Sequence, residues 1–245
     1  MHALSARIAG HFAARGEGEV CAVFKRSFYL RFDAAGGAAR FACVGDESIG
    51  NGPLNAIVGE FSLPSLGEKM SLAANRTWQP TRRAGLVDLA TLREAARERV
   101  PAEGLGCLVA GMHNALSAHA QPALDAVDEW IAGHSLDARA AQLIGLGPGL
   151  TPAGDDYLGG VMVALHLLDR PSQAASLWRW LEPKLASRSS AISAAHLAAA
   201  ATGEAHEALH DVLGGNPDLD ALDAVGHCSG WDALAGSVAV LQREG

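Results

Sequence analysis

The stretch that decides the fold is GLGPGLTPAGDDYLGG, residues 145–160. Its first eight residues hold three glycines and two prolines, a composition that predicts a shaped loop with backbone open to a ligand. Asp155 and Asp156 then begin a predicted helix that carries Val161 and Leu165. A helix N-terminus favours phosphate or carboxylate groups, and carboxylates beside it could act as a base or bind Mg²⁺. The stretch therefore predicts a loop-and-helix site for a small anion.

A purely structural interpretation of the same residues stays open. Asp155 and Asp156 could cap the helix, and Gly159 and Gly160 could allow a neighbouring helix to pack closely. The glycines do not fit G-x-G-x-x-G, and no G-K-[ST] follows them, so neither common nucleotide-binding motif is present.

A second copy of the pattern strengthens the functional interpretation. G-x-D-x-L-x-G occurs at 154–160 and again at 230–236. The repeat predicts two equivalent helices that pack across Gly160 and Gly236, with Asp156 and Asp232 facing one cleft. The lead-in to the second copy is GHCS, residues 226–229, which supplies an imidazole as acid or base and a hydroxyl.

The residues before and after position 80 differ in their predicted secondary structure. Apolar residues in the first part form short β-rich runs at 20–24, 27–32, 40–44 and 54–58, with a Gly-Gly turn signal at 36–37. Helical patterns dominate the second part, at 88–99, 106–119, 122–131, 156–168, 171–187, 191–201, 204–213 and 232–243. The predicted class is α+β, with an N-terminal antiparallel β-sheet or small barrel (residues 1–80) followed by an all-α helical domain (residues 81–245).

Composition excludes several classes of protein. The chain has 245 residues, 49% of them hydrophobic, and no apolar run approaches the roughly 18 residues of a membrane span. A net charge of −8 offers no general attraction for nucleic acid or an anionic membrane. The four cysteines are widely spaced and the N-terminus lacks a secretory signal pattern, so we expect a cytoplasmic protein with free thiols.

The pentapeptide HEALH at 206–210 matches the H-E-x-x-H motif of zinc hydrolases. On a helix, this spacing places two imidazoles on one face, with a glutamate beside them as base. Leu213 and Asn216 stand where an extended motif would have glycine and histidine, and a helix break follows at 214–217. We therefore favour a solvated helix face over a zinc site.

The two glycine-aspartate segments, 147–156 and 226–236, resemble the signatures of a bacterial domain family associated with purine and allantoin breakdown. One branch of that family is a subunit of the oxamate carbamoyltransferase complex. Weaker similarity extends to 52–58 and to Arg188, Ser193, Leu197, Gly203 and Glu207.

The resemblance implies a subunit of a carbamoyltransferase that handles carbamoyl phosphate, oxamate or oxalurate in purine-nitrogen catabolism. It implies other subunits of the complex as partners, and a homo-oligomer is an open alternative. Two rival functions remain, a non-catalytic metabolite-binding or assembly subunit and a metal-dependent hydrolase. We expect no resident cofactor, with Mg²⁺ as the alternative. The expected catalytic residues are Asp155, Asp156 and Asp232, and the expected substrate-binding residues are Gly147, Gly149, Thr151, Gly154, Arg188, Ser193, His227, Ser229 and Gly230.

Overall fold

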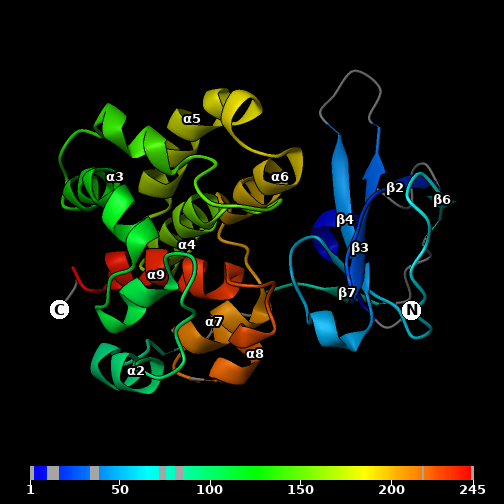
Figure 1. Cartoon of the computed structure of the whole chain (residues 1–245), viewed down its shortest axis with the longest axis horizontal. Coiled ribbons are helices and arrows are strands. Elements are labelled where there is room, and N and C mark those ends of the chain that lie inside the picture. Colours follow the sequence, from blue (N-terminus) through cyan, green and yellow to red (C-terminus); the bar gives the residue numbers. More distant parts are fainter. Residues whose placement is uncertain are drawn as a thin grey trace. The chain divides into compact units, whose positions relative to one another are not determined.

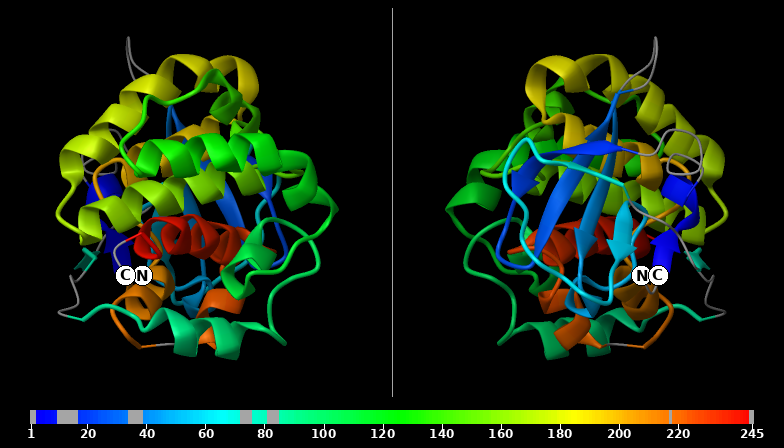
Figure 2. Two further views of the ribbon diagram at one scale, coloured as in Figure 1. Left: turned by 90° about the vertical axis from the view of Figure 1, so that its left-hand side faces the viewer. Right: turned by 90° about the vertical axis from the view of Figure 1, so that its right-hand side faces the viewer.

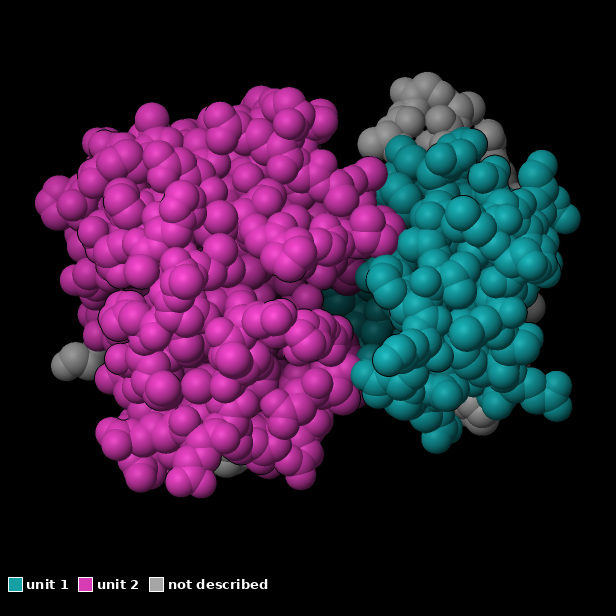
Figure 3. Space-filling view, in the orientation of Figure 1, with its two compact units in different colours: residues 1–81 teal, residues 82–245 magenta. Residues whose placement is uncertain are grey.

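The structure is a computed structural model that describes residues 3–9, 17–33, 39–71, 76–80, 85–216 and 218–243. It divides into two compact units, residues 1–81 and 82–245 (Figure 3). The strands lie in the first unit and nearly all of the helices in the second (Figure 1). The predicted α+β class is confirmed.

Unit 1 is built on a seven-stranded sheet with the strand order β6-β2-β3-β4-β5-β1-β7. Phe28, Leu30 and Phe32 alternate along β3 and are buried, as the period of two predicts. The strands are shown in the right-hand view of Figure 2. Their bounds are β1 Ala3–Ser5, β2 Gly18–Val23, β3 Ser27–Phe32, β4 Arg40–Gly45, β5 Asn55–Ile57, β6 Lys69–Met70 and β7 Thr77–Trp78.

The sheet is mixed, whereas the sequence pattern predicted antiparallel pairing throughout. Strands β2, β3 and β4 pair antiparallel, but β4 with β5 and β1 with β7 are parallel. Parallel pairing of consecutive strands requires a connection that returns the chain to its starting edge. Between β4 and β5 that return is made by the short 3₁₀ helix η1 (Glu47–Ile49) and the turn that follows it. The predicted turn at 36–37 lies outside the described residues.

Three strands, β1, β6 and β7, were not predicted from the sequence because they are only two or three residues long. β6 and β7 fall within 64–84, where prolines and glycines break any period and where the sequence predicts the domain boundary. β1 joins the sheet by pairing with β5 and β7. Such short strands are ordered by their pairing partners rather than by local sequence.

Unit 2 is helical and has its own hydrophobic core, drawn from every one of its longer helices. Nothing in the described ranges meets the combined length and hydropathy that a membrane-crossing helix requires. The elements are α2 Leu89–Ala96, η2 Gly106–Ala110, α3 Ala115–Ile131, η3 Ala138–Leu143, α4 Ala153–Leu167, α5 Pro171–Arg188, α6 Ala191–Ala200, α7 Glu207–Leu213, α8 Leu219–Asp223 and α9 Ser229–Leu241.

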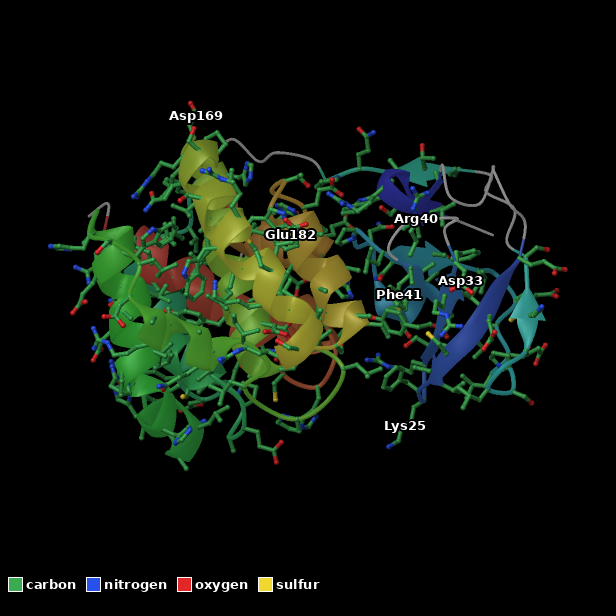
Figure 4. The ribbon with its side chains drawn as sticks, turned by 90° about the horizontal axis from the view of Figure 1, so that it is seen from above. Lys25, Asp33, Arg40, Phe41, Asp169 and Glu182 are labelled. Carbon is green, nitrogen blue, oxygen red and sulfur yellow. The ribbon has the colours of Figure 1, made fainter. Side chains whose placement is uncertain are left out.

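The helix predicted at 106–119 is wrong in its extent. The chain forms η2, turns at Gly111 with φ of 70°, and begins α3 only after Asn114, whose side chain caps that helix. Pro122 then lies inside α3, so the two helices predicted on either side of residue 120 are largely one. The turn between α4 and α5 passes through Asp169, whose φ of 58° is left-handed (Figure 4).

Helix α4 is the centre of unit 2. Nearly all its residues from Ala153 to Leu165 are buried, and it contacts α5, α6 and α9. A helix that is apolar on all sides must be surrounded by others. Its most extensive partner is α9, the red helix in Figure 2.

Candidate functional site

The two G-x-D-x-L-x-G segments form the beginnings of α4 and α9, and these helices cross at their glycines. A Cβ on Gly160 would lie 1.8 Å from the carbonyl oxygen of Ala233, and one on Gly236 would lie 1.9 Å from that of Tyr157. The contacts are reciprocal, since each glycine meets the residue that follows the aspartate of the other helix. The Ser237 hydroxyl adds a hydrogen bond to the Gly160 carbonyl at 3.0 Å. The predicted packing of the repeat across both glycines is confirmed.

Asp155 is buried and fixes the start of the loop. Its Oδ1 accepts a hydrogen bond from the Gly145 amide at 2.8 Å, and its Oδ2 accepts bonds from the hydroxyls of Ser193, at 2.7 Å, and Ser189. These donors join the loop, α4 and the start of α6. With both oxygens engaged, Asp155 acts as a positioning residue for the loop.

Positive φ angles at Gly147 (106°) and Gly149 (95°) give the loop the shape that its composition predicts. Gly154 is required for a different reason, because a Cβ there would lie 2.0 Å from the Leu143 carbonyl oxygen. At the end of the loop, the Thr151 hydroxyl lies 3.0 Å from that of Ser229, the first residue of α9. The end of the loop therefore contacts the first residue of α9, the second helix of the repeat.

Asp232 is buried and binds the turn that precedes η2. Its Oδ1 accepts hydrogen bonds from the amides of Leu105, at 2.6 Å, and Gly106, at 3.0 Å. Gly104 is needed here, since a Cβ would lie 2.5 Å from the carboxylate. Burial raises the pKa of Asp232 to about 6, against the opposing effect of these two amide donors and of His227.

Asp156 differs from the other two aspartates. Its Oδ2 is shielded from solvent and has no hydrogen-bond partner among the described residues. Burial raises its pKa well above the usual value; hydrogen bonds from Ser229 and Thr151 oppose this shift, while repulsion from Asp232 and Asp155 adds to it. Burial therefore favours the neutral form of the Asp156 carboxyl group, which lies beside two hydroxyls and keeps one oxygen without a partner in the described part of the chain.

Several of the first amides of α4 and α9 already have backbone acceptors. The Gly154 amide donates to the Leu146 carbonyl and the Asp155 amide to that of Pro152, both at 2.9 Å. In α9, the Gly230 amide donates to Val225 at 3.2 Å. The positive helix dipoles remain, and the hydroxyls of Thr151 and Ser229 are further hydrogen-bonding groups beside them.

Two residues beside Ser229 are less suited to chemistry than their types suggest. Burial, with repulsion from Asp232, Glu103 and Asp156, raises the pKa of Cys228 to about 11, so this thiol stays protonated at neutral pH. His227 is exposed, with its Nε2 3.3 Å from a carboxylate oxygen of Glu103. Neither is placed as an activated nucleophile or a sheltered base.

Arg188 and Ser193 both hydrogen-bond to the segments around the loop. The Arg188 guanidinium is exposed and donates to the Ala141 carbonyl at 3.1 Å, while its own backbone carbonyl lies against Gly145. Ser193 is buried and donates to Asp155.

Several residues of this framework were missed by sequence reasoning. Ser189 binds Asp155, and Ser190 caps α6 and donates to the Leu150 carbonyl in the loop. A Ser-Ser pair before a helix is a capping signal, but nothing local connects it to a loop 40 residues earlier. The turn at 104–106 carries only the signal of its two glycines.

The two histidines of the H-E-x-x-H motif are not presented together on one helix face, as a zinc site would require. His206 is the N-cap of α7, where its Nδ1 accepts from the Ala208 amide at 3.2 Å, and the Nε2 of His210 accepts from Ala205 at 3.1 Å. Across the described ranges, no group of three or more His, Cys, Asp or Glu side chains is arranged to hold a metal ion. The expectation about cofactors, with Mg²⁺ as the alternative, stays a prediction.

A scan against protein families finds one model that covers this site. Residues 143–241 match the model of oxamate carbamoyltransferase subunit AllH. The match runs from the end of η3 through α4 and α6 to the last residue of α9, all within unit 2. The family resemblance predicted from the glycine-aspartate segments is confirmed. Searches of curated proteins and of solved structures gave no match.

Proposed function

We propose that this chain is a subunit of a carbamoyltransferase that acts on carbamoyl phosphate and oxamate in purine-nitrogen catabolism. The AllH match supports the class of protein. The observation that carries the placement of the site is Asp156, whose shielded Oδ2 lacks a partner within the same matched segment. A buried polar group without a partner costs stability, which is typical of sites arranged for a ligand.

In this proposal, a neutral Asp156 carboxyl group and the hydroxyls of Thr151 and Ser229 bind the anionic group of the substrate. The dipoles of α4 and α9 favour negative charge at the same place. In the transfer, the oxamate nitrogen bonds to the carbamoyl carbon while the carbon–oxygen bond to phosphate breaks. Phosphate leaves with the electron pair and takes up the proton that the nitrogen loses. Asp155 and Asp232 act through the backbone by positioning the loop and the 104–106 turn.

The direct test is reconstitution with the partner subunits of the complex, followed by phosphate release from carbamoyl phosphate in the presence of oxamate. Asp156→Ala should lower turnover by about a hundredfold, the loss expected for one preorganised hydrogen bond to developing charge. The matched control is Asp169→Asn, an exposed aspartate in the turn after α4, which should keep full turnover. Wild-type turnover with Asp156→Ala would show that the catalytic site lies elsewhere.

The rival function is a non-catalytic metabolite-binding or assembly subunit. Binding and activity assays on the isolated chain distinguish it from the proposed function. We expect the chain to bind carbamoyl phosphate or oxalurate but to have little transferase activity without its partners. An anion at about a hundredfold over its Kd should add roughly 2.7 kcal/mol to the free energy of unfolding. No thermal shift with either anion would reject the proposed site, and full turnover by the lone chain would reject the need for partners.

A further inference from the structure

A cavity in unit 2 is lined by residues from α2, η2, α3, α4 and α9 and from the chain next to them. Figure 1 labels the four α-helices of this set. The volume of the cavity is about 200 Å³. Cavities for drug-sized ligands are typically ~300–1,000 Å³, so this one suits a smaller metabolite. It is separate from the Asp156 site, since Tyr157 rather than Asp156 contributes to its lining.

One part of the cavity wall is apolar. Leu108 from η2, Leu124 from α3 and Val238 from α9 contribute to it, together with two alanines of α9. Leu124 and Val238 belong to the core of unit 2, so this wall is built on well-packed helices. Such a wall fits a short aliphatic group.

A positive charge in the lining has no carboxylate partner among the described residues. The Arg93 Nη2 donates to the Gln242 side chain at 3.0 Å, and its Nε is shielded from solvent without any hydrogen-bond acceptor. A guanidinium binds a carboxylate with two parallel hydrogen bonds when its donors are free. Arg93 thus brings to the lining a positive charge with which a ligand carboxylate can pair.

Two negative charges lie in the same lining, three residues apart on α3. Asp125 accepts a hydrogen bond from Gln121 at 2.7 Å, and Asp128 accepts one from Arg243 at 3.3 Å. Burial raises the pKa of Asp128; the charge and hydrogen bond of Arg243 oppose this rise, and the charge of Asp125 adds a smaller contribution to it. An ammonium group between them would relieve this repulsion.

We propose that this cavity binds a small zwitterionic α-amino acid with an aliphatic side chain. The ligand carboxylate pairs with Arg93, its ammonium group with Asp125 and Asp128, and its side chain with the apolar wall. Asp128 pairs with Arg243, and within the described part of the lining neither Arg93 nor Asp125 lies within ion-pair distance of an opposite charge, so a ligand with one carboxylate and one ammonium group complements both. This site stands independently of the proposed carbamoyltransferase function.

Titration calorimetry of the full chain with L-leucine tests the proposal, with isoamylamine and isocaproate as probes that lack the carboxylate and the ammonium group. Leucine should bind, and each partial molecule should bind at least about tenfold more weakly, as expected for the loss of a charge-assisted hydrogen bond. Absence of leucine binding at millimolar concentration, or equal binding of either partial molecule, would overturn the proposal.

Variants then locate the binding. Arg93→Gln and Asp125→Asn should each weaken leucine binding about tenfold, whereas Arg97→Gln, an exposed arginine just after α2 that pairs with Glu94, should leave it unchanged. If circular dichroism shows that Arg93→Gln is misfolded, Arg93→Lys keeps the charge while removing Nε and should still weaken binding. Wild-type affinity in folded Arg93 and Asp125 variants would place the amino acid elsewhere and overturn the assignment.

Discussion

Three aspartates with the same side chain serve different purposes in this unit, and their partners decide which. Asp155 uses both oxygens to hold the loop and α6, and Asp232 uses Oδ1 to hold the 104–106 turn. Of the three, only Asp156 has an oxygen that is both shielded from solvent and without a hydrogen-bond partner in the described part of the chain. The sequence pattern identified all three but could not rank them, because the donors come from segments far away along the chain.

The protonation state of Asp156 gives a prediction about anion binding by the isolated chain. If the neutral carboxyl group donates a hydrogen bond, Asp156→Asn should keep the thermal shift with carbamoyl phosphate, since an amide also donates without charge. Asp156→Ala should lose the shift and still fold, because it removes a half-buried carboxyl group whose Oδ2 has no hydrogen-bond partner in the described part of the chain. Loss of the shift in Asp156→Asn, with the alanine variant folded, would show that the ionised form is required.

Asp232 gives a prediction about pH and stability. Its pKa is about 6 in the folded chain and about 3.9 in an unfolded one, so the folded state keeps a proton that the unfolded state has lost between these values. Stability should therefore fall as pH rises through this window, by roughly 3 kcal/mol in total for this group. Asp232→Asn keeps an oxygen for the Leu105 and Gly106 amides and should remove that part of the slope.

Urea unfolding of wild type and Asp232→Asn from pH 4 to pH 7 measures this slope, with Asp169→Asn as an exposed control that should retain it. A variant less stable than wild type at pH 7 would mean that the carboxylate is favoured by its surroundings.

At the scale of elements, the crossing of α4 and α9 depends on two glycines that have no room for a methyl group. Gly160→Ala or Gly236→Ala would place a Cβ within 2 Å of a carbonyl oxygen and should cost about 3 kcal/mol or more. Gly159→Ala is the matched control on the same helix, because its Cβ would meet the nearest side chain at 3.7 Å. That variant should be neutral or more stable by roughly 0.5–1 kcal/mol.

Thermal and urea unfolding of these three variants measures the difference. Equal stability of Gly236→Ala and Gly159→Ala would contradict the close crossing and, with it, the arrangement of the two aspartate-bearing helix ends.

Helix-level predictions succeeded where local signals agree with packing. The repeat at 154–160 and 230–236 was sufficient to predict two helices in contact, because glycines at matching positions have little other use inside helices. The helix at 106–119 failed because its apolar spacing ignored Gly111 and the Asn114 cap. The strands β6 and β7 could not be found, since two residues carry no periodicity.

At the scale of the whole molecule, unit 2 has its own core, and the AllH match lies within it. A chain of residues 82–245 should therefore fold alone, with strong helical circular dichroism and a single cooperative transition. The same truncated chain carrying Gly236→Ala should lose that cooperativity. A broad, non-cooperative melt of the unsubstituted unit 2 would show that residues 1–81 are needed to complete its core.

The class of the fold could be predicted from the sequence, but the mixture of parallel and antiparallel strands in the sheet could not. Alternation in β3 predicts a half-buried strand, yet it does not say whether its neighbours run parallel or antiparallel. That choice depends on connections such as η1, a short 3₁₀ helix capped by Asp46 that allows β4 and β5 to pair in parallel.

The pairing of α4 with α9 also sets an order of events during protein synthesis. Helix α4 leaves the ribosome long before α9 has been translated, so its apolar sides, including Val161 and Leu165, have no partner across the Gly160 crossing in the growing chain. Exposed apolar surface of this kind promotes aggregation of nascent chains. The unit cannot close its core until residue 241 has been made, and we expect chaperone contacts to map to α4 during that interval.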